Sequence, residues 1–435
     1  MEPLPVDVAQ LQRRDPMAWS TLLSRAADLN DVIVTAVTSE PLWTSYLAPT
    51  GRTTRTWSRQ VTRYLLTIDG CSDPLSFVGK RTNTIEAQVY HNLGPELPEL
   101  FAPCHFIHMD GDRSWLLLEE APNHFPPSSW VPKDIDAVVT GLAKVHATFW
   151  DEANESDLLD WLPFYFDESE TTPTPDELKR ESPTLFEEGP GALISDHALQ
   201  SAGGLAPLFV QAANGLVIMR ELGGWPGVLG ETHLAALADL IDDPLPMLNT
   251  LRDLPVSVLH TAPHTYNWSL TLFDHTFLLD WSEARLGPGV LDLVSFLETY
   301  PLLYVEEDLP RTLWPSSTDR GDRDEIHVRV RDLTPALEET VVDGYLLAMS
   351  SALGSTFPAR QMRQALPAAR CLYVLTNWLP YFATWASDMP NRYVWQRVNR
   401  MTEAELAENG LGPMVGIRPY FAGVFQRFLQ AYRNL

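Results

Sequence analysis

The order of hydrophobic and polar residues divides the chain into a strand-rich first part and a helix-rich second part. Three early segments are rich in β-branched residues or alternate between apolar and polar positions, which predicts strands at 32–37 (VIVTAV), 60–68 (QVTRYLLTI) and 75–80 (LSFVGK). Two further strands are expected at 104–108 and 114–118, joined by the turn Asp110-Gly111-Asp112. Between these groups, apolar residues at every fourth position predict a helix over 83–93.

The pattern becomes helical after a proline-containing break that begins at Glu119. Apolar stripes predict helices at 135–149, 231–241, 333–352, 359–386 and 413–434. A short β-rich stretch at 268–279 interrupts them, and the acidic, proline-interrupted segment 151–190 is expected to be irregular surface. We therefore predict an α+β fold with a helical extension (1–30), a β-rich lobe (31–120) and a mainly helical lobe (121–435) that contains a hairpin region at 259–281.

Charge and cysteine content narrow the possible partners. The 435 residues include 57 Asp and Glu but only 31 Lys and Arg, which gives a formal net charge of −26. This charge argues against nucleic acid or an anionic membrane surface as a partner and suits a neutral or cationic substrate. The three cysteines have no metal-binding spacing, so free thiols and no zinc are expected. Without a signal-like start or an apolar run of about 20 residues, we expect a cytoplasmic protein with no membrane segment.

The candidate chemistry lies at residues 259–267 (LHTAPHTYN) and 277–281 (FLLDW). Asn267 begins one strand of the expected hairpin, and Asp280 ends the other. Their side-chain oxygens can therefore converge on a hard cation such as Mg²⁺, whose shell nucleotide phosphates would complete. Taken alone, the same pattern also fits a buried structural histidine at His260 and a turn aspartate at Asp280.

The pattern resembles the catalytic loop of protein kinases, H-R-D-x-x-x-x-N, which is followed by a metal-binding aspartate on the next hairpin. It is more similar to the variant H-G-D-x-H-x-x-N of the aminoglycoside phosphotransferase and choline kinase-like families, and Gly287-Pro288 with Asp292-Leu293 resembles the end of that motif. The resemblance covers about residues 31 to 300. It implies a protein-kinase-like two-lobed fold, ATP or another nucleoside triphosphate as phosphoryl donor, and Mg²⁺ held by Asn267 and Asp280.

Upstream residues extend the resemblance. Lys80, Glu86 and Tyr90 resemble the family pattern K-x-x-x-x-x-E-x-x-x-Y. The resemblance implies that Lys80 binds nucleotide phosphates and that Glu86 holds it, so the two side chains should approach to salt-bridge distance. Two solvated surface charges are the alternative interpretation. Glu119 ends the strand 114–118, where family members offer backbone groups to adenine.

Two further segments fit the family with less specific roles. Residues 142–150 (LAKVHATFW) resemble a family helix, in which we interpret His146 and Trp150 as structural. Gly51 and the hydroxyl-rich segment 53–58 (TTRTWS) fall between the first two strands, where a phosphate-covering loop belongs.

The main departure from the family is Ala262, which stands where the catalytic aspartate is expected. An aspartate there accepts or orients the proton of the substrate hydroxyl, and alanine cannot do so. His264, two residues later, is a candidate substitute because its ordinary pKa is near 6.5. It is also a candidate contact of the γ-phosphate, and His260 opens the loop.

Two functions from different classes follow. The first is ATP-dependent phosphoryl transfer to a hydroxyl of a small molecule or of a peptide serine or threonine. The second is a pseudokinase-like nucleotide-binding or scaffold module that acts through a protein partner without turnover. Retention of Lys80, Glu86, Asn267 and Asp280 favours the first, and Ala262 favours the second.

Overall fold

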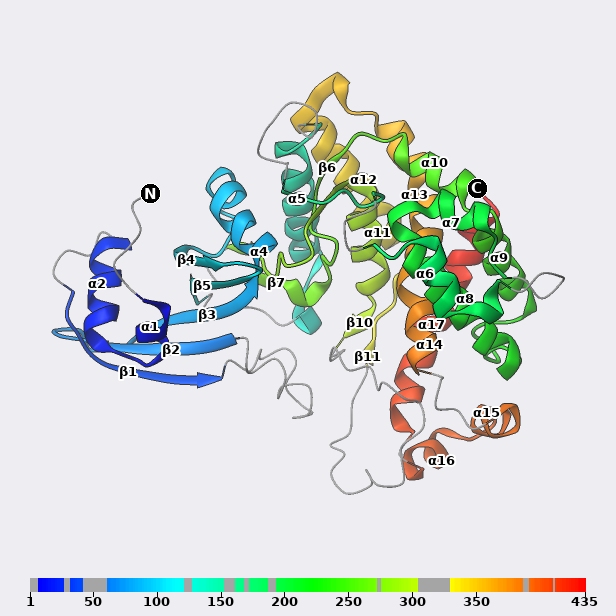
Figure 1. Ribbon diagram of the computed structural model, residues 1–435, viewed down its shortest axis with the longest axis horizontal. Helices are drawn as coiled ribbons and strands as arrows, with labels where there is room; N and C mark the ends of the chain where they lie inside the picture. The colour runs from blue at the N-terminus through cyan, green and yellow to red at the C-terminus, as the bar shows by residue number, and fades with distance from the viewer. Residues whose placement is uncertain are drawn as a thin grey trace. The chain divides into compact units, whose positions relative to one another are not determined.

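The chain divides into two units by its internal contacts, and each unit is described by itself. Unit 1 comprises Met1–Gly141 and Tyr266–Ala284, and unit 2 comprises Leu142–Thr265 and Arg285–Leu435. The computed structural model (Figure 1) describes residues 7–26, 32–41, 61–120, 127–151, 161–167, 172–186, 193–271, 275–303, 329–385, 391–409 and 411–435. The expected phosphate-covering segment 51–58 lies outside these residues.

Unit 1 contains an antiparallel sheet of five strands in the order β1-β2-β3-β5-β4. The strands are β1 (Val34–Pro41), β2 (Val61–Ile68), β3 (Leu75–Asn83), β4 (Cys104–Asp110) and β5 (Arg113–Glu119). The helices are α1 (Val8–Gln12), α2 (Pro16–Ala26), α4 (Thr84–Gln88), the π-helical turn η1 (Val89–Leu93) and the beginning of α5 (Pro132–Thr148). A short hairpin, β7 (Trp268–Leu270) and β8 (Thr276–Leu278), completes the unit.

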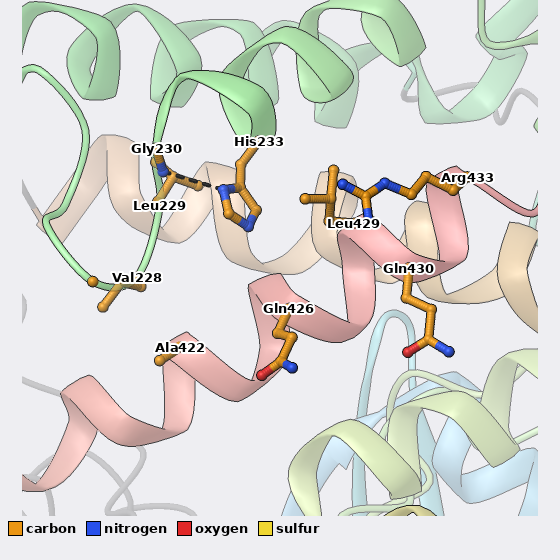
Figure 2. Close-up of a pocket in the computed structure, with 10 residues that line it drawn as sticks. Val228, Leu229, Gly230, His233, Ala422, Gln426, Leu429, Gln430 and Arg433 are labelled. Atoms are coloured by element: carbon orange, nitrogen blue, oxygen red, sulfur yellow. Dashed lines mark hydrogen bonds between the residues drawn. The ribbon is translucent and has the colours of Figure 1, made fainter.

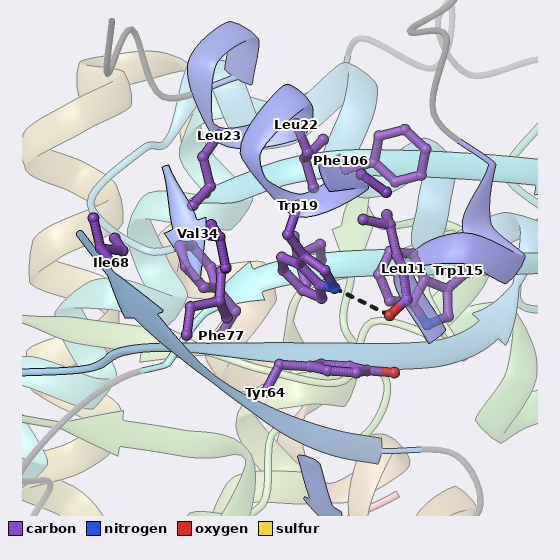
Figure 3. Close-up of a cluster of buried hydrophobic side chains, with 13 residues drawn as sticks. Leu11, Trp19, Leu22, Leu23, Val34, Tyr64, Ile68, Phe77, Phe106 and Trp115 are labelled. Carbon is purple, nitrogen blue, oxygen red and sulfur yellow. Dashed lines mark hydrogen bonds between the residues drawn. The ribbon is translucent and has the colours of Figure 1, made fainter. Parts of the chain in front are cut away.

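One face of this sheet is covered by α1 and α2. Leu11 and Trp19 from the helices pack against Tyr64, Phe77 and Trp115 from the strands, and the Trp19 indole donates a hydrogen bond to the Leu11 carbonyl (Figure 3). Since successive side chains of a strand point to opposite faces, every second residue of β3 is left for the other face.

Gly79 of β3 is required by this packing. A Cβ at that position would lie 2.7 Å from ring atoms of both Tyr64 and Trp115. Such an approach is sterically excluded, so the covered face tolerates no side chain there. The next residue, Lys80, points to the other face.

Unit 2 is mainly helical. Its helices after α5 are α6 (Pro175–Glu181), α7 (Asp196–Ala202), α8 (Ala206–Leu222), α9 (Glu231–Asp242), α10 (Leu245–Arg252), α11 (Val290–Thr299), α12 (Pro335–Leu353), α13 (Ala359–Tyr373), α14 (Leu379–Trp385), α15 (Arg392–Val398), α16 (Glu403–Glu408) and α17 (Gly412–Tyr432). Two strand pairs accompany them: β6 (Ser257–Leu259) with β9 (Arg285–Gly287), and β10 (Leu302–Leu303) with β11 (Arg329–Val330).

The prediction of an α+β fold with a β-rich amino-terminal part and mainly helical remainder is confirmed. The boundaries at residues 30 and 120 stay predictions. The expectation of irregular structure throughout 151–190 is wrong at α6, because Thr174 and Glu177 form a capping box that begins this helix.

Among the residues that the structure describes, one helical run is apolar and long enough to cross a membrane by length and composition alone. It is the continuous segment Asp196–Leu222, made of α7, the 3₁₀ turn η7 (Gly203–Leu205) and α8. Slightly more than half of its most apolar stretch, 56%, is buried inside the protein. The core helix of a globular protein has the same properties, so this run is weak evidence for a membrane span.

A buried carboxylate ties the helices of unit 2 together. Glu298 of α11 is fully buried, and its oxygens lie 2.6 Å from Nε of Arg370 on α13 and 2.6 Å from Nη2 of Arg427 on α17. The Tyr420 hydroxyl donates to the Glu298 carbonyl over 2.7 Å. Burial alone would raise the pKa of Glu298, but Arg370 and Arg427 outweigh it and lower this pKa below its ordinary value.

Glu298→Gln should therefore destabilise unit 2 by about 3–5 kcal/mol at neutral pH, because two nearly buried arginines lose the fully buried carboxylate that they share, although Arg370 keeps its contact with Glu338. The lowered pKa means that the stabilisation is present above about pH 4.5 and is lost as the pH falls through that lowered value. Urea denaturation between pH 3 and 7 measures both effects. The exposed Glu221→Gln on α8 is the matched control, and an equal stability loss in both variants contradicts the assignment.

Candidate functional site

Three charged residues that are distant in the sequence meet in unit 1. The Lys80 ammonium lies 2.8 Å from the Glu86 carboxylate and 2.6 Å from Oδ1 of Asp280. The Lys80 side chain is 13% exposed and that of Glu86 is 1% exposed, so little water screens the pair. The predicted approach of Lys80 and Glu86 to salt-bridge distance is confirmed, and the alternative of two solvated surface charges is wrong.

Local structure explains why these residues meet. Asn83 caps α4, since its side-chain oxygen accepts the Glu86 N–H over 3.0 Å. The amide nitrogen of the same Asn83 side chain donates to the Ser282 carbonyl over 2.7 Å, and the Trp281 N–H donates to Glu86 over 3.2 Å. The end of β3, the start of α4 and the segment after β8 are thus fastened to one another by hydrogen bonds.

The charge of Lys80 is stabilised by its partners. Burial alone would lower the pKa of Lys80, but the carboxylates of Glu86 and Asp280 outweigh it and raise this pKa above its ordinary value. Lys80 is therefore a fixed cation at physiological pH, a form that attracts phosphate oxygens.

Asp280 has an unusual backbone conformation. Its φ is 65°, in the left-handed region that residues other than glycine adopt rarely. Its carboxylate accepts hydrogen bonds from Lys80 and from the Ser282 hydroxyl, the latter over 3.1 Å. Backbone strain of this kind concentrates at functional sites, where neighbouring contacts maintain it.

Asn267 and Asp280 lie at the open end of the β7–β8 hairpin. Trp268 pairs with Leu278, and one step further the Leu279 N–H donates to the Asn267 carbonyl over 2.8 Å, so Asp280 follows directly. This pair supplies an amide oxygen and a carboxylate, the ligand types that Mg²⁺ prefers. Among the described residues, no group of three or more His, Cys, Asp or Glu forms a metal cluster. A magnesium ion that keeps most of its shell for phosphates and water needs no such cluster.

Glu119 is not brought to Lys80. It pairs with Phe77 across the strands, on the face covered by α1 and α2, and its carboxylate lies 3.6 Å from His105. Its backbone N–H donates to the Pro103 carbonyl over 2.8 Å. The next residue, Glu120, accepts a hydrogen bond from the Ser76 hydroxyl. Ser76 precedes Phe77 on β3, so its side chain points to the opposite face, which also carries Lys80. Sequence reasoning missed Glu120, although it is adjacent to the predicted residue.

The loop that begins at His260 belongs to unit 2 up to Thr265. Its backbone is held by Asp292 at the start of α11, whose carboxylate accepts the His260 N–H over 2.7 Å and the Thr261 N–H over 2.8 Å. Thr261 has a φ of 69°, which costs a β-branched residue of the order of 1–2 kcal/mol. The two hydrogen bonds to a charged acceptor offset this strain.

His146 supports the same carboxylate. Its Nε2 lies 3.3 Å from Oδ2 of Asp292, its Nδ1 lies 2.8 Å from the Tyr345 hydroxyl, and its carbonyl accepts a hydrogen bond from Ser257. A Cβ at Gly289 would lie 2.5 Å from the His146 ring, so the close approach of this loop requires glycine. His146 is fully buried, in keeping with its interpretation as a structural residue.

The predicted catalytic residues occupy two different environments. The His260 ring is fully buried, and its Nδ1 accepts the Ala262 N–H over 3.3 Å, so this side chain shapes the loop. Ala262 and His264 are half-buried. Any base role of His264 stays a prediction.

A separate cavity of about 570 Å³ lies in unit 2 (Figure 2). It lies between the turn at 227–230, α9 and α17, where His233, Gln426 and Arg433 are among the lining residues. Nδ1 of His233 accepts the Gly230 N–H over 3.2 Å, and burial, followed by the charge of Arg433, lowers the pKa of His233. The cavity contains none of the predicted site residues.

Comparison with known proteins finds matches only among solved structures, since no family model and no curated protein matches the chain. An aminoglycoside phosphotransferase from Alicyclobacillus acidocaldarius is 14% identical with a TM-score of 0.39, covering 85% of this chain and 89% of that chain. Choline kinase from Cryptosporidium parvum is 10% identical with a TM-score of 0.43, covering 87% and 92%. Choline kinase LicA from Streptococcus pneumoniae is 12% identical with a TM-score of 0.37, covering 95% and 98%. At these values the likeness assigns neither a substrate nor a role to any side chain.

Asp292→Asn should loosen the loop at its first two residues. The His260 and Thr261 N–H groups bond different oxygens of Asp292, so in the amide one of them faces an NH2 donor in place of an acceptor, and the negative charge is lost as well. We expect a stability loss of about 1.5–3 kcal/mol and faster hydrogen exchange at these two amides, measured by urea denaturation and exchange mass spectrometry. The exposed Asp253→Asn serves as control, and unchanged exchange at 260–261 contradicts this role.

Proposed function

We propose that this chain binds a nucleoside triphosphate with Mg²⁺ and belongs to the aminoglycoside phosphotransferase and choline kinase-like class of phosphotransferases. The phosphoryl acceptor is a hydroxyl of a small molecule or of a peptide serine or threonine. The observation that carries the proposal is the nearly buried Lys80 cation held between Glu86 and Asp280. A nearly buried lysine that two carboxylates keep charged suits a polyanionic ligand. Its partners are a glutamate from the helix after β3 and an aspartate that follows a hairpin, the residue types that kinase-like phosphotransfer uses beside such a lysine.

Each side chain then has a defined part. Lys80 binds phosphate oxygens as a point charge, and Glu86 orders its stem. Asn267 and Asp280 would hold Mg²⁺, which when bound supplies positive charge against the phosphate oxygens. Asp280 also contacts Lys80, so the same carboxylate would serve both the phosphate-binding lysine and the metal.

The proton of the acceptor hydroxyl has no aspartate to receive it at position 262. Phosphoryl transfer passes through a loose transition state, so positioning and charge stabilisation account for most of the catalysis. His264 is the residue of the same loop that can accept a proton near neutral pH. A scaffold that binds nucleotide without turnover is the second candidate function, and Ala262 is the specific observation that favours it.

Nucleotide binding can be tested by thermal stability. ATP with Mg²⁺ should raise the melting temperature of the wild type, because a ligand present at about 100 times its Kd stabilises the native state by about 2.7 kcal/mol. Lys80→Met should remove most of this stabilisation, and Asp280→Ala should remove its Mg²⁺-dependent part. Lys133→Met, at an exposed lysine of α5 in the same unit, is the matched control. If millimolar ATP leaves the wild-type melting temperature unchanged, the proposed function is wrong.

The role of His264 can be tested by turnover. If this histidine is the base, His264→Ala should lower kcat by about 10²–10⁴-fold, and Ala262→Asp in the same background should recover much of the loss. The assay is nucleotide-dependent phosphorylation of a panel of hydroxyl compounds and peptides. An unchanged kcat removes His264 from the mechanism. If the wild type binds nucleotide without turnover and the Ala262→Asp variant turns over, the chain is a scaffold that has lost its base.

A further inference from the structure

A second polar cluster lies in unit 1, formed by residues of three strands and by Glu120, which follows β5. Nε of Arg63 on β2 lies 3.0 and 2.9 Å from the two oxygens of Glu120, and Nη2 of Arg63 bonds the same carboxylate. Nη1 of Arg63 lies 2.8 Å from Glu40 on β1, and the Ser76 hydroxyl on β3 donates to Glu120. The guanidinium is thus held along two of its edges by two carboxylates. These carboxylates raise the pKa of Arg63, and Glu120 has the larger effect.

The cluster lies on the face of the sheet that carries Lys80. Arg63 pairs with Val78, which precedes Lys80 by two residues on β3. The neighbours of this pair, Tyr64 and Phe77, belong to the core on the opposite face. At about 3.4 Å per residue, Val78 lies about 7 Å from Lys80 along the strand.

The direction of a bound nucleotide follows from what surrounds Lys80. On the side toward the end of β3, Thr82 bonds Glu86 and Asn83 caps α4, so that side is filled by protein. On the other side, Val78 and then Ser76 follow, with Arg63 beside them. A nucleotide whose phosphates bind Lys80 would therefore extend toward Val78 and Arg63, which would place its base near this pair.

The chemistry of the cluster suits a base and not a phosphate. One guanidinium and two carboxylates carry a formal charge of −1, which repels a further anion. Because the carboxylates engage the edges of the Arg63 guanidinium, its flat faces are what remains for a ligand, and the side chain is 33% exposed. Nucleobases stack on arginine guanidinium planes, and a plane already fixed by ion pairs loses little entropy on binding.

We propose that Arg63, held by Glu120 and Glu40, is the platform on which the base of the bound nucleotide stacks. This proposal rests on the nucleotide binding proposed above and adds a base-recognition residue to it. In this proposal Arg63 increases the affinity for the base of the nucleotide, and Lys80 increases the affinity for its phosphates.

Calorimetric titration with two probes separates these contributions. Mg·ATP carries a base, whereas Mg·tripolyphosphate carries only the phosphate chain. Arg63→Ala should weaken ATP binding by about 5- to 150-fold, the effect of losing one stacking contact with a base, and should leave tripolyphosphate binding within twofold of the wild type. Arg63→Lys keeps the charge but has no plane, so it should behave like Arg63→Ala. Arg113→Ala, at an exposed arginine of β5, should change neither affinity.

The outcomes are distinguishable. If Arg63→Ala leaves ATP affinity unchanged, or weakens both probes equally, the stacking platform is wrong while nucleotide binding stands. If neither probe binds the wild type, the proposed function itself is wrong and the platform with it. If Arg63→Ala does not fold, Glu40→Gln is used in its place, since it weakens only the contact at Nη1 of Arg63. A loss of ATP affinity without a loss of tripolyphosphate affinity in this variant supports the stacking platform. If Glu40→Gln leaves the affinities for both ATP and tripolyphosphate unchanged, this result counts against the stacking platform.

Discussion

The Lys80 ammonium is a nearly buried positive charge, and the arrangement of unit 1 follows from the need to neutralise it. An isolated charge at such a place is costly, so carboxylates must be present at short range. Glu86 comes from the helix after β3, and Asp280 comes from a hairpin 200 residues later. Both can reach Lys80 because the opposite face of the sheet is sealed by α1 and α2, which leaves alternate residues of β3 to face these partners.

Unit 2 also contains buried carboxylates that are matched by nearby donors, and two of them lie on a single helix. Asp292 and Glu298 both lie on α11 and are both fully buried, and both oxygens of each carboxylate accept a hydrogen bond. Asp292 fixes the strained backbone at 260–261, and Glu298 binds Arg370 and Arg427 from two other helices. The loop that carries His264 is therefore anchored through a helix that is itself held at its other end by buried ion pairs.

Position 262 is alanine, and the loop that carries it is held by the Asp292 carboxylate through the His260 and Thr261 N–H groups. In unit 1, Lys80 is paired with Glu86 and Asp280, and the open end of the β7–β8 hairpin carries Asn267 and Asp280. A protein that needed none of them would have no physical reason to keep a buried lysine charged or a threonine in a left-handed conformation. The phosphate-binding part of the proposed function is thus independent of how the acceptor proton is removed.

The sequence by itself determined the strands of unit 1, most of the long helices and the Lys80–Glu86 pair, because alternation, apolar periodicity and motif spacing are local signals. It did not predict the short strand pairs β6–β9 and β10–β11 of unit 2. It did not predict α8, whose residues are apolar on most sides and show little periodicity, and it overlooked the capping box at Thr174. Only the tertiary structure decided that Asp280 shares Lys80 with Glu86, that Glu119 and Glu120 lie on opposite faces of the sheet, and that Arg63 lies beside Val78. These contacts join segments far apart in the chain, and which face a side chain occupies depends on strand register and on what covers the sheet.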